Sequence, residues 1–257
     1  MTHLDDAEFA THLATETGKR LVELRNQLVQ RGISSWDLKD AGDAMAQKFL
    51  MSQLHALRPN DAVLSEEALD NSARLTSKRV WIIDPLDGTQ EYSEPERNDW
   101  AVHVALWARD EDGKGELVAG AVSLPAIGIT LSTNPPPPTP RSHAGSPRLV
   151  LSRTRTPREA VAVAEALGCD ALRLGSAGAK AMSVVLGESD IYLHSGGQHQ
   201  WDSAAPVAVA RAAGLHTSRL DGSPLVYNEP DTWLPDLIVC RAELAEPVLA
   251  ALRNSNR

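Results

Sequence analysis

The chain of 257 residues contains only two cysteines, Cys169 and Cys240, and aromatic residues make up just 4% of it. Two isolated cysteines outside any metal-binding motif exclude a disulfide framework and indicate reduced thiols in a cytosolic protein. Because aromatic residues are scarce, the core must consist mainly of Leu, Val, Ile and Ala. No window approaches the length of a membrane span, and the acidic N-terminus lacks the apolar region of a signal peptide. We therefore expect a cytoplasmic protein without a membrane partner.

Positively charged residues are also fewer than negatively charged ones. The formal net charge is −9, with 25 Lys and Arg against 34 Asp and Glu. This balance argues against a basic nucleic-acid-binding surface, so no nucleic-acid partner is expected. An anionic small molecule would be repelled by the protein as a whole unless bound cations reversed the local potential.

A proline-rich segment at residues 134–147 divides the sequence. Four consecutive prolines, Pro135 to Pro138, cannot continue a helix or a central strand. We place a domain boundary here, between an N-terminal α+β domain at residues 1–134 and a C-terminal α/β domain at residues 148–257. The alternative is a long surface loop within a single domain.

Hydrophobic periodicity predicts the elements on either side of this segment. Before it we expect helices over residues 6–30 and 43–57, and strands over residues 62–64, 79–83, 99–108, 116–123 and 127–131. After it, strands alternate with helices, as in an α/β arrangement. The strands are expected over residues 149–151, 172–174, 191–194 and 237–240, and the helices over residues 157–168, 177–186, 202–213 and 242–252.

The most informative segment is Trp-Ile-Ile-Asp-Pro-Leu-Asp-Gly-Thr at residues 81–89. An apolar strand leads directly into Asp84 and Asp87, and carboxylates at a strand end suit hard cations such as Mg²⁺. Gly88 carries no side chain that would block an anion from approaching backbone N–H groups. The segment thus offers carboxylates for a metal and amides for a phosphate, whereas Asp-Gly alone would indicate only an ordinary turn.

Four further residues are candidates, each with an ordinary alternative role. Glu66 follows a short strand and could belong to a solvated loop. Asp43, which we place at the start of the second helix, and Asp202, at the start of a later one, could each be helix N-caps. Lys180 lies in a small, apolar helix, where a lysine usually extends its side chain to the surface.

As a set, these segments resemble the inositol monophosphatase family of Mg²⁺-dependent, lithium-sensitive phosphatases. The resemblance covers nearly the whole chain and rests on Ser65-Glu66-Glu67, on residues 81–89 and on Trp201-Asp202-Ser203-Ala204-Ala205. The family usually has Gly where this chain has Ser65. Membership implies a layered α-β-α-β-α sandwich of the inositol monophosphatase and fructose-1,6-bisphosphatase type, and it suggests a homodimer.

The resemblance also implies a role for each matching position. Two or three Mg²⁺ ions would be held by a set of carboxylates and one backbone carbonyl, namely Glu66, Asp84, Leu86, Asp87 and Asp202. Gly88 and Thr89 would contact the substrate phosphate through their N–H groups. Thr89, paired with Asp43, resembles the dyad that orients the attacking water, and Glu66 would assist it. Metal ions can neutralise a phosphate dianion and lower the pKa of a bound water, so no protein nucleophile is required.

Other segments resemble one branch of the family, the CysQ-type 3′(2′),5′-bisphosphate nucleotidases. These enzymes convert 3′-phosphoadenosine 5′-phosphate to AMP in sulfate assimilation. The resemblance lies in residues 87–92, in residues 175–180 and in the segment around Arg153. It implies that Lys180 and Arg153 face a substrate phosphate. Moreover, Ser195 stands where the inositol branch carries a glutamate.

Two alternatives remain at this point. One is an inositol monophosphatase or a broad sugar phosphatase that also acts on fructose 1,6-bisphosphate. The other is a catalytically inactive scaffold, which should have lost at least one metal carboxylate. All four are present: Glu66, Asp84, Asp87 and Asp202.

Overall fold

Two helices form one outer layer of the fold. The computed structural model describes residues 4–142 and 144–255. Helix α1 (Asp6–Gln30) begins at a capping box formed by Asp5 and Glu8 and buries an apolar face. Helix α2 (Ser35–Leu57) is capped by Ser34. The prediction that Asp43 starts this helix is therefore wrong, because α2 begins eight residues earlier and Asp43 lies in its interior.

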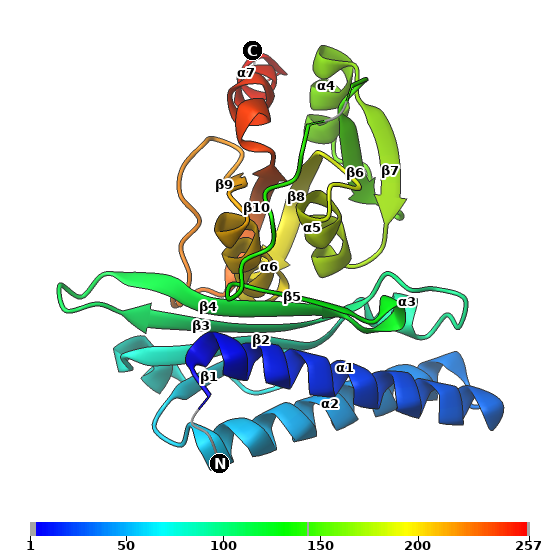
Figure 1. The fold of residues 1–257 in the computed structure, drawn as a ribbon, viewed down its shortest axis with the longest axis vertical. Helices are drawn as coiled ribbons and strands as arrows, with labels where there is room; N and C mark the ends of the chain where they lie inside the picture. The colour runs from blue at the N-terminus through cyan, green and yellow to red at the C-terminus, as the bar shows by residue number, and fades with distance from the viewer. Residues whose placement is uncertain (1–3, 143, 256–257) are drawn as a thin grey trace.

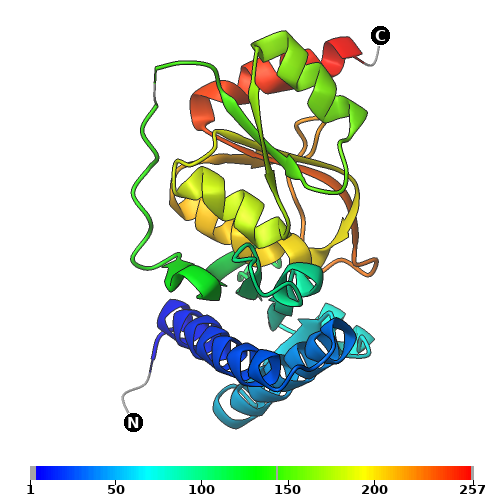
Figure 2. The same ribbon diagram turned by 90° about the vertical axis from the view of Figure 1, so that its right-hand side faces the viewer.

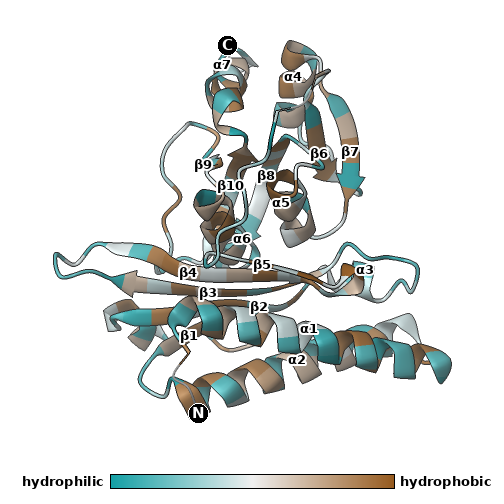
Figure 3. Ribbon diagram, in the orientation of Figure 1, coloured by the Kyte–Doolittle hydropathy of each residue, from teal (hydrophilic) through white to brown (hydrophobic). Residues whose placement is uncertain are grey.

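The first sheet packs on these helices with the strand order β1-β2-β3-β4-β5. Its strands are β1 (Ala62–Ser65), β2 (Arg79–Asp87), β3 (Ala101–Arg109), β4 (Gly115–Leu124) and β5 (Ile129–Ser132). Strand β1 is parallel to β2, and the remaining pairs are antiparallel. Trp81 and Ile83 of β2 face α1 and α2, whereas Val80 and Ile82 face the next layer. The sheet is thus covered on both faces, and Figure 3 shows the apolar character of its central strands.

The bounds of all five strands differ from the prediction, and the differences in β2 and β5 have a structural reason. Strand β2 continues beyond Ile83 to Asp87, with an irregularity in its pairing to β3 between Asp84 and Asp87. Strand β5 begins at Ile129 because Pro125–Ile127 form a 3₁₀ turn that the alternation of apolar residues did not reveal.

The second sheet has the strand order β7-β6-β8-β10-β9. Its strands are β6 (Arg148–Ser152), β7 (Asp170–Leu174), β8 (Ile191–His199), β9 (His216–Ser218) and β10 (Trp233–Cys240). Strands β7 and β8 run parallel to β6, whereas β10 is antiparallel to β8 and β9. The short strand β9 was not expected from the sequence, and β8 and β10 are longer than predicted.

Helices α5 (Ala177–Val185) and α6 (Gln200–Ala212) lie between the two sheets, as Figure 1 shows. One apolar cluster joins them to the inner faces of both sheets. Helices α4 (Arg158–Leu167) and α7 (Ala245–Ser255) cover the outer face of the second sheet. The five layers confirm the predicted α-β-α-β-α sandwich.

The proline-rich segment connects the sheets without forming a helix or strand in its described part. It runs along the outside of the molecule (Figure 2). The division into domains at residues 1–134 and 148–257 stays a prediction, and the shared core between the sheets shows that the two halves are packed together. Both cysteines are free, Cys240 buried and Cys169 partly exposed. Within the described residues, no helix is both long and apolar enough to cross a membrane.

Candidate active site

Three carboxylates converge where the two halves of the chain meet. Asp84 and Asp87 lie at the end of β2, and Asp202 lies in the first turn of α6. Each offers a ligand atom, and these atoms lie within 4.8 Å of one another. Asp84 and Asp87 are buried and Asp202 is nearly so. Such a concentration of negative charge in a poorly hydrated place is unfavourable unless a cation or protons neutralise it.

Asp84 fits a metal ligand for a specific reason. Its Oδ1 accepts a hydrogen bond from the Leu86 amide at 3.1 Å, but its Oδ2 is buried without a hydrogen-bond partner. Burial, followed by repulsion from Glu66 and Asp87, raises the pKa of Asp84 well above its ordinary value. A buried carboxylate oxygen rarely lacks a partner, so this atom marks a place for a cation.

Asp87 is held in its ionised form by the N-terminus of α5 and by a histidine. The amides of Ala177 and Gly178 donate to its two oxygens at 3.2 and 2.6 Å. The Nε2 of His103 lies 3.2 Å from Oδ2. Burial alone would raise the pKa of Asp87, but His103 and these amides outweigh it and lower the pKa. A helix N-terminus stabilises a carboxylate in this way.

His103 was not identified from the sequence. It is fully buried in β3, and its Nδ1 lies 3.1 Å from the carbonyl oxygen of Trp201, to which it donates. Asp87 raises the pKa of His103 against the opposing effect of burial. His103 therefore links Asp87 to the residue that precedes Asp202. The only available signal was a polar residue inside an otherwise apolar strand.

Asp202 is not the N-cap of α6, although its side chain takes part in capping this helix. Its carboxylate accepts a hydrogen bond from the amide of His199, the N-cap residue of α6, at 2.6 Å. Asp202 is thus not the cap itself but lies in the first helical turn. Burial and repulsion from Asp87 raise its pKa to about 6.

Glu66 lies at the rim of the same cluster, just after β1. Its carboxylate lies beside that of Asp84, and loss of hydration together with repulsion from Asp202 raises its pKa to about 7. Because the side chain also reaches solvent, Glu66 closes the cluster on the open side of the cleft.

Asp43 and Thr89 also lie together. A hydrogen bond from Thr89 lowers the pKa of Asp43, but burial and repulsion from Glu67 dominate and raise it to about 7. The Thr89 hydroxyl also reaches the carbonyl oxygen of Leu86 at 3.2 Å. Gly88, which precedes the short helix α3 (Thr89–Tyr92), has a φ of 85°. This left-handed conformation suits glycine and leaves the first amides of α3 without partners inside the helix.

The two predicted phosphate-binding cations behave differently. Lys180 is buried at the wall of the cleft, and its Nζ donates to the carbonyls of Gly175 and Ser176. It is therefore not the surface lysine of the ordinary alternative. Arg153 forms ion pairs with Glu91 and Glu94, each at 2.7 Å. Its charge is thus already neutralised within the protein.

The acidic cluster opens into a cleft of about 410 Å³. Glu66, Asp87, Asp202 and Gly88 line one part of it, and residues from the end of β6, from α5 and from β8 line the rest. Among the latter are two residues that the sequence analysis did not single out, Arg155 and His194. The cleft is thus lined by both acidic and basic side chains.

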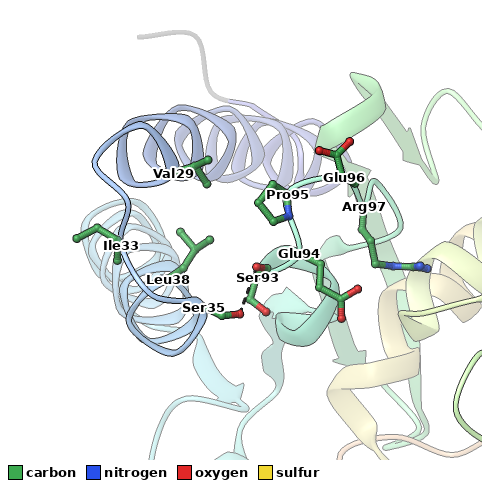
Figure 4. Close-up of a pocket in the computed structure, with 9 residues that line it drawn as sticks. All are labelled: Val29, Ile33, Ser35, Leu38, Ser93, Glu94, Pro95, Glu96 and Arg97. Carbon is green, nitrogen blue, oxygen red and sulfur yellow. Dashed lines mark hydrogen bonds between the residues drawn. The ribbon is translucent and has the colours of Figure 1, made fainter.

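A second cavity, of about 500 Å³, lies at the turn between α1 and α2 (Figure 4). Its apolar wall is formed by Val29 of α1, Leu38 of α2 and Ile33 in the turn between them. A hydrogen bond of 3.3 Å from Ser35 to the Ser93 carbonyl crosses one side. None of the clustered carboxylates lines this cavity, so the chemistry belongs to the acidic cleft.

A layered α/β sandwich with buried carboxylates beside free turn amides defines a metal-dependent phosphatase. The chain belongs to the inositol monophosphatase family, whose profile matches residues 5–257. The family predicted from the sequence is therefore confirmed.

Individual relatives refine this classification. The chain is 50% identical over 246 residues to the 3′-phosphoadenosine 5′-phosphate phosphatase of Mycobacterium tuberculosis, covering 94% of this chain and 91% of the relative. It is 29% identical to the 3′(2′),5′-bisphosphate nucleotidase CysQ of Escherichia coli, over 76% of this chain and 81% of the relative. Inositol monophosphatase II of Staphylococcus aureus superposes with a TM-score of 0.77 at 21% identity, covering 96% and 95% of the two chains, which supports the fold alone.

Proposed function

We propose that this protein hydrolyses the 3′-phosphate of 3′-phosphoadenosine 5′-phosphate to give AMP and phosphate, and that it serves sulfate assimilation. The observation that carries the proposal is the 50% identity, across almost the whole chain, to a phosphatase named for this substrate. Two of the segments that resemble the nucleotidase branch, residues 175–180 and the segment around Arg153, lie outside the metal motif and favour the same substrate.

The metal is Mg²⁺, bound by the carboxylates of Glu66, Asp84, Asp87 and Asp202 and by the carbonyl of Leu86. The orphaned Oδ2 of Asp84 supports this ligand set. Two or three ions supply neutralisation of the phosphate charge, a lowered pKa for a bound water and stabilisation of the leaving oxygen. An all-oxygen ligand set of this kind suits Mg²⁺ better than softer metals.

The protein's own residues position the reactants. The amides of Gly88 and Thr89 hold the reacting phosphate at the first turn of α3, where they lack helical partners. Asp43 accepts a hydrogen bond from the Thr89 hydroxyl, and this pair orients the attacking water, while Glu66 assists from the rim. A pKa of about 7 suits Asp43, which is not among the metal ligands, to exchange a proton near neutral pH.

Asp202 and Lys180 complete the substrate side. Asp202 faces the cleft beside the metal cluster, and Lys180 adds positive potential at the cleft wall. We assign Arg153 a supporting role, because its two ion pairs hold Glu91 and Glu94 next to the phosphate-binding turn. Lithium inhibits by occupying a Mg²⁺ position with half the charge.

A turnover comparison tests the proposal. Purified protein with saturating Mg²⁺ is assayed for phosphate release from 3′-phosphoadenosine 5′-phosphate, inositol 1-phosphate and fructose 1,6-bisphosphate. We expect the highest kcat/KM for the nucleotide. A higher kcat/KM for inositol 1-phosphate or fructose 1,6-bisphosphate would overturn the nucleotidase assignment in favour of the other branch of the family.

The oligomeric state and the cellular location that we propose are those implied by membership of the family. The protein is a homodimer, which sedimentation of the purified chain tests directly. It acts in the cytoplasm, where its two free thiols stay reduced. Localisation of a tagged chain in fractionated cells tests the second point.

A further inference from the structure

We propose that Arg155 binds the phosphate that does not react, and so selects a bisphosphate over a monophosphate. This inference rests on the proposed nucleotidase function and deepens it. A bisphosphate nucleotide brings a second dianionic group into a cleft that is also lined by carboxylates. A basic side chain with free donors must meet that group, because an unpaired phosphate would be repelled.

The other basic side chains near the cleft already have partners within the protein. Lys180 is buried and directs its Nζ to two backbone carbonyls. Arg153 is paired with Glu91 and Glu94, which neutralise its guanidinium. Burial and the nearby cations lower the pKa of His194, so this histidine is neutral. Arg153 is thus neutralised by carboxylates, and Lys180, although charged, has only one N–H left for a second phosphate.

Arg155 differs from these three residues in its exposure and in its partners. It lines the cleft and is exposed. Its Nη1 donates to the carbonyl oxygen of Gly196 at 3.1 Å. Among the described residues no carboxylate forms an ion pair with it, so most of its five N–H donors remain available. A guanidinium that is anchored at one nitrogen and open at the other is well suited to bind phosphate with two parallel hydrogen bonds.

The backbone of β8 at Gly196 leaves room for this side chain. Gly196 lies in β8 with a φ of 108°, a conformation that favours glycine. A Cβ atom at Gly196 would lie 2.6 Å from the Arg155 guanidinium, too close for both to keep their positions. Because Gly196 has no side chain, the Arg155 guanidinium can lie directly against the backbone of β8. The guanidinium is thus placed by the fold and does not merely extend into solvent.

The test compares two substrates that differ only in the second phosphate. The bisphosphate is 3′-phosphoadenosine 5′-phosphate, and its partner is adenosine 3′-monophosphate, which has the same reacting ester and the same base. For Arg155→Ala we expect KM for the bisphosphate to rise about ten- to a hundredfold, as for loss of a charge-assisted hydrogen bond. KM for the monophosphate should change by less than about twofold. Arg155→Lys, which keeps the charge but loses the planar fork, should fall between wild type and Arg155→Ala.

Arg158→Ala is the matched control. Arg158 lies three residues further on, with its side chain 85% exposed and paired to Glu159, and it does not line the cleft. We expect neither substrate to respond to this change. If Arg155→Ala impairs both substrates equally, or leaves the bisphosphate unaffected, the assignment of Arg155 is wrong. If wild-type protein instead prefers inositol 1-phosphate to the bisphosphate, the proposed function itself fails, so the two failures are distinguishable.

Discussion

Replacing Asp84 by Asn should inactivate the enzyme and at the same time stabilise its metal-free form. Asn keeps the shape of the side chain and the oxygen that accepts the Leu86 amide, but it removes one buried negative charge. Charges 4.8 Å apart repel by about 3.5 kcal/mol at an effective dielectric constant of about 20. Because the cluster shares protons near neutral pH, we expect a gain of about 1–2 kcal/mol in the free energy of unfolding. This corresponds to a rise in Tm of about 2–8 °C.

Two measurements check this prediction. Scanning calorimetry in chelator gives the Tm, and phosphate release at saturating Mg²⁺ gives kcat, which should fall by at least about a thousandfold. Asp112→Asn, an exposed residue at the tip of the β3–β4 hairpin, changes the net charge equally and should change neither value. An Asp84→Asn protein that melts at a lower temperature in chelator, or that keeps more than about a tenth of kcat, would refute the reasoning.

Three further predictions concern ions, pH and Lys180. Turnover should require Mg²⁺ and be inhibited by Li⁺ at about millimolar concentration, and full activity in chelator would contradict the metal site. Carboxylates in the cleft have folded-state pKa values raised to about 6 or 7, so they stabilise the metal-free protein fully only below their unfolded values near pH 4. Its Tm should therefore fall as pH rises from 4 to 8, and a flat profile would argue against the clustered charges. Lys180→Met should lower Tm and raise KM for bisphosphate and monophosphate alike, because Lys180 anchors the loop before α5; an effect confined to the bisphosphate would instead make it a direct phosphate ligand.

The sequence predicted best those features whose cause is local. The bounds of α1 were predicted to the residue because its capping box and apolar stripe lie within one continuous segment. The metal-binding segment was recognisable because Asp84, Asp87 and Gly88 are neighbours in the chain. By contrast, the start of α2 was missed because residues 35–37 are exposed and the next buried positions, Leu38 and Gly42, include a glycine, which weakens the apolar signal.

Features that depend on packing between distant segments could not be predicted. His103 acquires its role only when the end of β2 brings Asp87, and α6 brings Trp201, next to its ring. Arg155 lies in a loop with no motif of its own, and its significance depends on the absent side chain at Gly196. In both cases the chemistry arises from a contact across the fold, and the residue type alone gave no distinguishing signal.

The hydrogen bonds that α5 donates to Asp87 have a consequence for the order in which the protein folds and binds metal. The two amide donors belong to α5, and the third aspartate of the cluster belongs to α6, both translated long after β2. A nascent chain that has completed only the first sheet holds repelling carboxylates with nothing to orient them. Affinity for the metal must then appear late, once the middle helical layer has docked. Metal capture would thus report that synthesis and folding of the enzyme are nearly finished.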